Sequence, residues 1–157
     1  MATRTKFLIN ALDPEDATRL YEKLKREIRW EEGIRSRSGF TRKAKAISAE
    51  ELLLGEHPEI LECLASVLAL LDGDYHVRGV YLNFYEDGRM YTPNHSHRGT
   101  QQLVISLGAP RVLVVGRKEY VMSNGSAVLF GGSTHGVPRD PTVSEGRISI
   151  ATFMTRK

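Results

Sequence analysis

The chain has 157 residues, of which 41% are hydrophobic and 26% charged, and its formal net charge is +3. This length favours one domain, residues 1–157, with a full core, and the composition is that of an ordinary soluble globular protein. The mildly basic balance permits a polyanionic partner without requiring one.

The longest apolar run bears on whether the chain crosses a membrane, and the number of cysteines bears on its redox compartment. The apolar run at residues 63–71 is too short to cross a bilayer. Residues 1–4 do not begin a signal peptide. The single cysteine, Cys63, excludes an internal disulfide and fits a reducing compartment. We therefore expect a protein without a membrane span in the cytoplasm, or in the nucleus if the source is eukaryotic.

Helices are predicted in the first half, after a short strand at residues 5–10. Asp13 and Pro14 are typical of a helix N-terminus, and apolar residues follow at helical spacing to about residue 29. Ser48 and Glu51 form a capping box that begins a second, short helix. A third helix is expected from residue 58 to about residue 71.

Residues 31–47 are rich in lysine and arginine and contain two glycines, which favours a basic hairpin or lid. Clustered basic residues beside an aromatic suit a nucleic-acid backbone. A solvated hairpin accounts for the same composition equally well. The candidate nucleic-acid-binding residues are Arg35, Arg37, Phe40, Arg42, Lys43 and Lys45.

From residue 75 to 157 the pattern changes to short runs rich in β-branched and aromatic residues, separated by glycine-containing turns. Helices followed by many short strands predict an α+β fold. We expect a double-stranded β-helix, that is a jelly-roll or cupin-like barrel, with the N-terminal helices packed on one sheet.

Three of the five histidines are candidates for a metal site. His95 and His97 stand two residues apart, so on a strand they point to the same face. His135 lies much further along the chain, so only a fold that joins distant strands brings it to them. Three imidazoles can hold a first-row transition metal. Three loop histidines with no shared role are the alternative.

Five segments together resemble the iron(II)- and 2-oxoglutarate-dependent dioxygenases of the AlkB type. They are residues 83–88, 95–97, 104–108, 131–137 and 147–149, and their order and approximate spacing agree with that family. Residues 42–44 also resemble the family's nucleotide-recognition lid, with Thr41 where a proline is common. The resemblance implies the same double-stranded β-helix, with the site in residues 75–157.

The activity implied is oxidative demethylation or hydroxylation of a nucleic-acid base, single-stranded or flipped out of a duplex, as in DNA repair. The cofactors implied are Fe(II) and the cosubstrate 2-oxoglutarate. The implied metal ligands are His95, His97 and His135. The implied cosubstrate residues are Arg147, Ser149, Asn83 and Tyr85, with the guanidinium on the distal carboxylate.

Two departures from the family pattern matter. His97 stands where the family has an aspartate, which removes one negative charge from the metal ligands. The sequence leaves open whether His97 binds the metal or turns away and leaves a weak or inactive site. In the last strand, Ser149 and Phe153 replace an asparagine and an arginine, which weakens the case for a nucleic-acid substrate more than the case for the cosubstrate.

Two alternatives remain. One is a cupin-type three-histidine metalloprotein that acts on or binds a small molecule without 2-oxoglutarate; Gln102 stands where cupins have a glutamate. The other is a catalytically weakened AlkB-like protein that binds nucleic acid. The position of Arg147 discriminates between the dioxygenase and the cupin. If Arg147 faces the metal inside the barrel, 2-oxoglutarate is favoured; if it faces solvent, the cupin is favoured.

Overall fold

The structure, a computed structural model, describes residues 4–32, 35–36 and 39–157, and for residues 35–36 and 39–40 it describes the backbone alone. The helices are α1 (Pro14–Glu27), α2 (Ala49–Leu53) and α3 (Pro58–Leu68). None of the helices in these ranges is long and apolar enough to cross a membrane.

The larger sheet has the strand order β1-β11-β8-β13-β6-β5-β2. Its strands are β1 (Lys6–Leu8), β2 (Glu31–Glu32), β5 (Lys43–Ser48), β6 (Tyr75–Tyr85), β8 (Gln101–Gly108), β11 (Ala127–Phe130) and β13 (Arg147–Arg156). Neighbouring strands are antiparallel throughout. The first and last strands of the chain therefore belong to one sheet.

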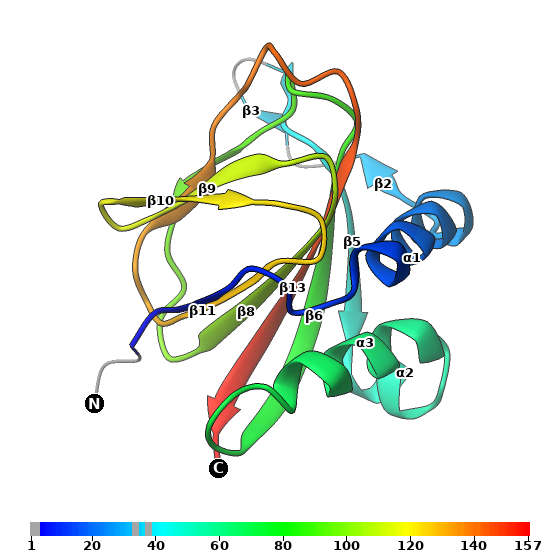
Figure 1. The fold of residues 1–157 in the computed structure, drawn as a ribbon, viewed down its shortest axis with the longest axis vertical. Helices are drawn as coiled ribbons and strands as arrows, with labels where there is room; N and C mark the ends of the chain where they lie inside the picture. Colours follow the sequence, from blue (N-terminus) through cyan, green and yellow to red (C-terminus); the bar gives the residue numbers. More distant parts are fainter. Residues whose placement is uncertain (1–3, 33–34, 37–38) are drawn as a thin grey trace.

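The smaller sheet has the order β10-β9-β12-β7. Its strands are β7 (Thr92–His95), β9 (Arg111–Val115), β10 (Lys118–Met122) and β12 (His135–Val137). Figure 1 shows the helices on one side of the large sheet and β9 and β10 on the other. This arrangement confirms the predicted double-stranded β-helix with helices packed on one sheet.

The helices begin where the sequence predicts. The Asp13 carboxylate accepts a hydrogen bond from the Glu15 backbone N–H at 2.9 Å, and Pro14 occupies the first turn of α1. At α2 the capping box between Ser48 and Glu51 is complete. Helix α1 buries Ala17, Tyr21 and Leu24, which join the core cluster formed with the large sheet.

Strand alternation separates a structural face from a site face. On β6 and β13, successive side chains point to opposite sides of the sheet. One side contributes Leu82, Phe84, Ile148 and Ile150 to the core cluster shared with the helices. The other side carries Asn83, Tyr85, Arg147 and Ser149, and the register places Asn83 opposite Ser149 and Tyr85 opposite Arg147. A slip of one residue would exchange these two sets.

The segment predicted as a basic hairpin contains paired strands in its described backbone. Strand β2 pairs with β5, and β3 (Arg35–Ser36) pairs with β4 (Gly39–Phe40). Arg37 lies outside the described residues, as do the side chains of Arg35 and Phe40. The large sheet continues from this hairpin into β6, so the segment borders the site face.

Candidate metal and cosubstrate site

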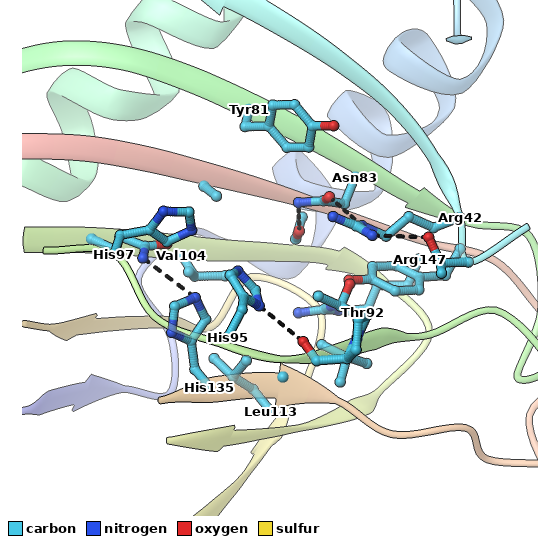
Figure 2. A pocket seen from close by; sticks show the side chains of 18 of the residues that line it. Arg42, Tyr81, Asn83, Thr92, His95, His97, Val104, Leu113, His135 and Arg147 are labelled. Atoms are coloured by element: carbon cyan, nitrogen blue, oxygen red, sulfur yellow. Dashed lines mark hydrogen bonds between the residues drawn. The ribbon is translucent and has the colours of Figure 1, made fainter. Parts of the chain in front are cut away.

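A pocket of about 470 Å³ opens between the two sheets. This volume is within the range of small-molecule sites, roughly 300–1,000 Å³. Its described lining contains two arginines and three histidines but no aspartate or glutamate. Figure 2 shows the histidines toward one side of the pocket and Arg42 and Arg147 toward the other. Such a pocket favours anionic ligands.

The structure brings the three candidate metal ligands together. His95, at the end of β7, pairs directly with His135, at the start of β12, and His97 follows two residues later. One ring nitrogen of each lies within 4.8 Å of the others. The ring centroids of His95 and His135 are 4.2 Å apart. Small rotations of the rings would bring all three nitrogens to one ion.

Backbone carbonyls orient two of the rings. The Nδ1 atoms of His95 and His135 lie 2.9 Å from the carbonyl oxygens of Pro93 and Ser133, respectively. Because a carbonyl only accepts, Nδ1 must carry the proton in each ring, and Nε2 keeps its lone pair. Such backbone contacts are typical of metal-binding histidines.

Burial keeps two of the imidazoles neutral. It lowers the pKa of His135 to about 4, with a smaller lowering by the other two histidines and an opposing contribution from the Ser133 carbonyl. Burial, and then His95, also lower the pKa of His97. A neutral imidazole is the form that binds metals. The His97 ring also packs edge-to-face on Phe153, with centroids 5.0 Å apart.

Gln102 is a pocket residue to which the sequence assigns no role in the dioxygenase. It lies buried on β8, and its Nε2 is 3.3 Å from Nε2 of His135. The amide oxygen and nitrogen of a glutamine are nearly interchangeable in position. Gln102 can therefore hydrogen-bond to a group held next to His135. Gln102 and Val104 stand two residues apart on β8 and both line the pocket, so strand alternation is the sequence pattern that could have identified Gln102 as a pocket residue.

Arg147 is buried in the site face with unused donors. Its side chain is 1% exposed, and Nε donates to Ser106 Oγ at 2.7 Å. Nη1 and Nη2 are buried and have no hydrogen-bond partner among the described residues. Burial lowers the pKa of Arg147 to about 10, with Tyr85 opposing the shift, so the guanidinium stays charged at neutral pH. A buried charge with free donors needs an anion.

Another buried arginine shows how a structural guanidinium differs. Arg111 donates to the carbonyl oxygens of Asp87, Met90 and Pro138, at 3.2, 2.7 and 2.8 Å. These bonds tie together two loops that flank the pocket. Both Nη atoms of Arg111 are thus used by the fold, whereas those of Arg147 are left for a ligand.

The predicted cosubstrate residues line the same pocket as Arg147. The Asn83 amide Nδ2 donates to Ser149 Oγ at 3.1 Å. The Tyr85 hydroxyl lies 2.6 Å from Thr92 Oγ1 on the opposite sheet. The polar groups are therefore fixed by one another before any ligand binds.

Arg42, one of the candidate nucleic-acid-binding residues, is turned into the pocket. Its side chain is 8% exposed and lines the pocket. Arg42 Nε donates to Asn83 Oδ1 at 2.7 Å, and Nη1 donates to Thr41 Oγ1 at 3.0 Å. The neighbouring basic residues point elsewhere: Lys43 Nζ is 3.2 Å from Glu86 Oε1, and Lys45 Nζ is 3.5 Å from Glu31 Oε1.

Replacing Gly136 by alanine should weaken metal binding about tenfold or more. A Cβ at this position on β12 would clash with Asn94 Oδ1 and lie 2.8 Å from the Thr92 carbonyl oxygen on β7. The two strands must move apart, which separates His95 from His135, and overpacking of this kind costs roughly 1–3 kcal/mol of stability. Titration with Co(II) and thermal unfolding measure the two effects.

The matched control is Gly132→Ala. Its Cβ would approach the His97 carbonyl oxygen at 3.6 Å, an ordinary contact. We expect Co(II) affinity close to wild type. A Gly136→Ala variant that binds Co(II) as tightly as Gly132→Ala would show that the strand pair does not set the spacing of the histidines.

No protein-family model matches the sequence, and no curated protein matches it. Solved structures do match the fold. A viral collagen prolyl hydroxylase from Paramecium bursaria Chlorella virus-1, in complex with 2-oxoglutarate, has a TM-score of 0.66 at 12% identity, covering 97% of this chain and 96% of that chain.

Two further structures agree. An oxidoreductase of the 2-oxoglutarate–Fe(II) oxygenase family from Burkholderia pseudomallei has a TM-score of 0.63 at 18% identity, with coverage of 98% and 84%. The non-heme α-ketoglutarate-dependent epimerase SnoN from nogalamycin biosynthesis has a TM-score of 0.66 at 11% identity, with coverage of 97% and 78%. The chain shares its fold with these proteins.

Proposed function

We propose that this protein is an Fe(II)- and 2-oxoglutarate-dependent dioxygenase. The observation that carries the proposal is Arg147, whose Nη1 and Nη2 are buried without partners in a pocket that has no acidic residue in its described lining. A carboxylate accepts from both Nη atoms at once. Because Arg147 faces the pocket and not solvent, the cupin alternative without 2-oxoglutarate is disfavoured. The shared fold adds support.

His95, His97 and His135 would hold Fe(II). When bound, the iron supplies activation of O₂ and oxidation of a C–H bond, coupled to decarboxylation of 2-oxoglutarate to succinate. All three ligands are neutral imidazoles, so the aspartate charge of the AlkB-type pattern is missing. The dianionic cosubstrate supplies negative charge to this site instead, which suits a pocket whose described lining carries none.

The side chains of the pocket would bind the cosubstrate and orient it. Ser106 fixes the Arg147 guanidinium through Nε, so its two Nη atoms keep one direction. The Tyr85–Thr92 contact joins the two sheets beside it. Apolar lining residues such as Val104 and Leu113 limit the water that can reach the reacting groups.

Calorimetry tests the proposal. Mn(II)-loaded protein should bind 2-oxoglutarate, and metal-free protein should bind it far more weakly, since one end of the cosubstrate loses its partner. Fe(II)-loaded protein should release succinate in an O₂-dependent manner. If Mn(II)-loaded wild-type protein does not bind 2-oxoglutarate, the proposal is refuted and the cupin alternative is favoured again.

The finer prediction, AlkB-type oxidation of a nucleic-acid base, comes from the family resemblance and from the basic hairpin. Among its described side chains, Arg42 is buried in the pocket, and Lys43 and Lys45 are each paired with a glutamate. The matched structures are a collagen prolyl hydroxylase and an epimerase from nogalamycin biosynthesis, among others. These observations favour a substrate other than a nucleic acid.

The salt dependence of binding tests the nucleic-acid prediction directly. If the protein neutralises phosphates, its affinity for a single-stranded oligonucleotide should fall as the salt concentration rises. The slope of log affinity against log salt concentration should be about −0.7 for each phosphate neutralised. Replacing Lys43 and Lys45 together by alanine should then make that slope shallower by about 0.7 for each phosphate that is no longer neutralised. Wild-type protein without measurable affinity for DNA or RNA at low salt contradicts it and leaves the dioxygenase proposal intact.

A further inference from the structure

We propose that Arg42 forms a second anion site in the pocket and binds a carboxylate group of the primary substrate. The inference deepens the proposed function and rests on it, because it takes Arg147 as the partner of the cosubstrate. It names the substrate class: a small organic acid with an apolar body.

The side chain of Arg42 points in a different direction from those of the basic residues that follow it in the sequence. Lys43 and Lys45 reach carboxylates near the surface, whereas Arg42 is turned inward and lines the pocket. A guanidinium placed out of water without a carboxylate is costly unless it serves a ligand. Its described partners, Asn83 and Thr41, are both neutral.

The guanidinium is held in one orientation. Asn83 Nδ2 donates to Ser149 Oγ, so the amide turns its Oδ1 toward Arg42 and accepts from Nε. Thr41 Oγ1 accepts from Nη1. A guanidinium has five N–H donors, and among the described residues Nη2 has no acceptor. Figure 2 shows this chain of contacts along one wall of the pocket. Such preorganised donors suit a planar carboxylate.

The charge of the pocket favours a second anion. Fe(II) brings two positive charges, and Arg147 and Arg42 bring one each. The dianion 2-oxoglutarate compensates only half of this sum, and the described lining has no aspartate or glutamate to compensate the rest. A carboxylate on the primary substrate lowers the positive charge that remains after 2-oxoglutarate has bound.

The sheet order separates the two arginines. Arg147 begins β13, and Arg42 stands just before β5, with β6 between these strands. A cosubstrate that reaches from Arg147 to the histidines follows β13. Arg42 lies two strands away from that path, near the edge of the sheet, and so is available to a different molecule.

The rest of the lining indicates a carboxylate and not a phosphate. A phosphate brings three oxygens and up to two charges, and lysine is absent from the described lining. The lining also contains aromatic and apolar side chains, among them Tyr81, Leu113 and Phe153. A hydrocarbon body fits there, with its charge on Arg42 and a C–H bond toward the histidines.

Matched acids and amides test the site. Mn(II)-loaded protein, with and without saturating 2-oxoglutarate, is titrated with benzoate and benzamide and with hexanoate and hexanamide. We expect each acid to bind at least tenfold more tightly than its amide. Arg42→Gln should remove this difference, and Arg42→Lys should keep most of it. Arg78→Gln, at an exposed arginine on β6, is the matched control and should behave as wild type.

Three results would overturn the inference. Acids and amides that bind wild type equally would show that the pocket does not select a carboxylate. A loss of 2-oxoglutarate affinity of tenfold or more in Arg42→Gln, with normal thermal unfolding, would assign Arg42 to the cosubstrate. Adenosine monophosphate that binds more tightly than benzoate, and does so through Arg42, would assign the site to a phosphate.

The proposed function can fail separately. If wild-type protein does not bind 2-oxoglutarate with Mn(II), the dioxygenase proposal fails, while the comparison of acids and amides without 2-oxoglutarate still reports on Arg42. If 2-oxoglutarate binds and the acids do not, only the second anion site is refuted.

Discussion

Arg147→Ala should weaken 2-oxoglutarate binding to the metal-loaded protein by about 2–5 kcal/mol, the usual cost when a buried carboxylate loses its charged partner. Each 1.4 kcal/mol is about a tenfold change in affinity, so the dissociation constant should rise by more than an order of magnitude. The reason is the pair of Nη atoms that have no other partner among the described residues. Calorimetry with Mn(II) measures the change.

Stability separates this effect from misfolding. Arg147→Met keeps most of the volume of the side chain and removes a buried charge that has no carboxylate partner among the described residues. We expect its thermal stability without ligand to equal or exceed that of wild type, while 2-oxoglutarate binding disappears. Its metal affinity should hardly change, since Arg147 does not contact the histidines. Binding of 2-oxoglutarate at wild-type affinity by Arg147→Met would refute the assignment.

His135→Ala should lower metal affinity more than a hundredfold. Partners that only orient a metal ligand are worth about 10–100-fold, and His135 would be a ligand itself. His95→Ala should act similarly, since the two histidines are paired across β7 and β12. Anaerobic reconstitution with Fe(II), followed by metal analysis, measures the effect. Metal-dependent binding of 2-oxoglutarate should disappear with it.

The chain supplies its own control in the histidines outside the pocket. His76→Ala removes an exposed imidazole on β6 and should leave about one Fe(II) per chain. Unchanged metal content in His95→Ala and His135→Ala would disprove the site.

His97→Asp restores the carboxylate of the AlkB-type pattern. It should bind Fe(II) as tightly as wild type or more tightly, because an anionic ligand replaces a neutral one, and turnover of 2-oxoglutarate should increase. Disappearance of turnover in a folded His97→Asp protein would show that the three-histidine form is the working site.

The shared face of His95 and His97 could be predicted because they stand two residues apart in the sequence. The role of Arg147 comes from the resemblance to the AlkB type and not from a local pattern. The helix starts were also predictable, since Asp13, Pro14 and the Ser48–Glu51 box act through local backbone groups.

The direction of Arg42 could not be predicted from its neighbourhood. A basic hairpin gives no sign of which side chain turns inward, because that depends on Asn83, far away in sequence, and on the pairing of β5 with β6. The contact of Gln102 with His135 was missed for a similar reason: it joins strands of different sheets, and alternation along β8 indicates only that Gln102 faces the same side as Val104.

The two faces of β6 and β13 have a consequence for how such a protein can change over evolutionary time. Residues that hold the fold together and residues that meet ligands alternate along the same strands, yet they contact different layers. A substitution at Phe153 or Tyr81 would change the lining of the pocket and leave Leu82 and Ile150 in the core shared with the helices. New substrate preferences can therefore arise by single changes while the chain still folds, so descendants of one barrel can diverge in chemistry while their architecture persists.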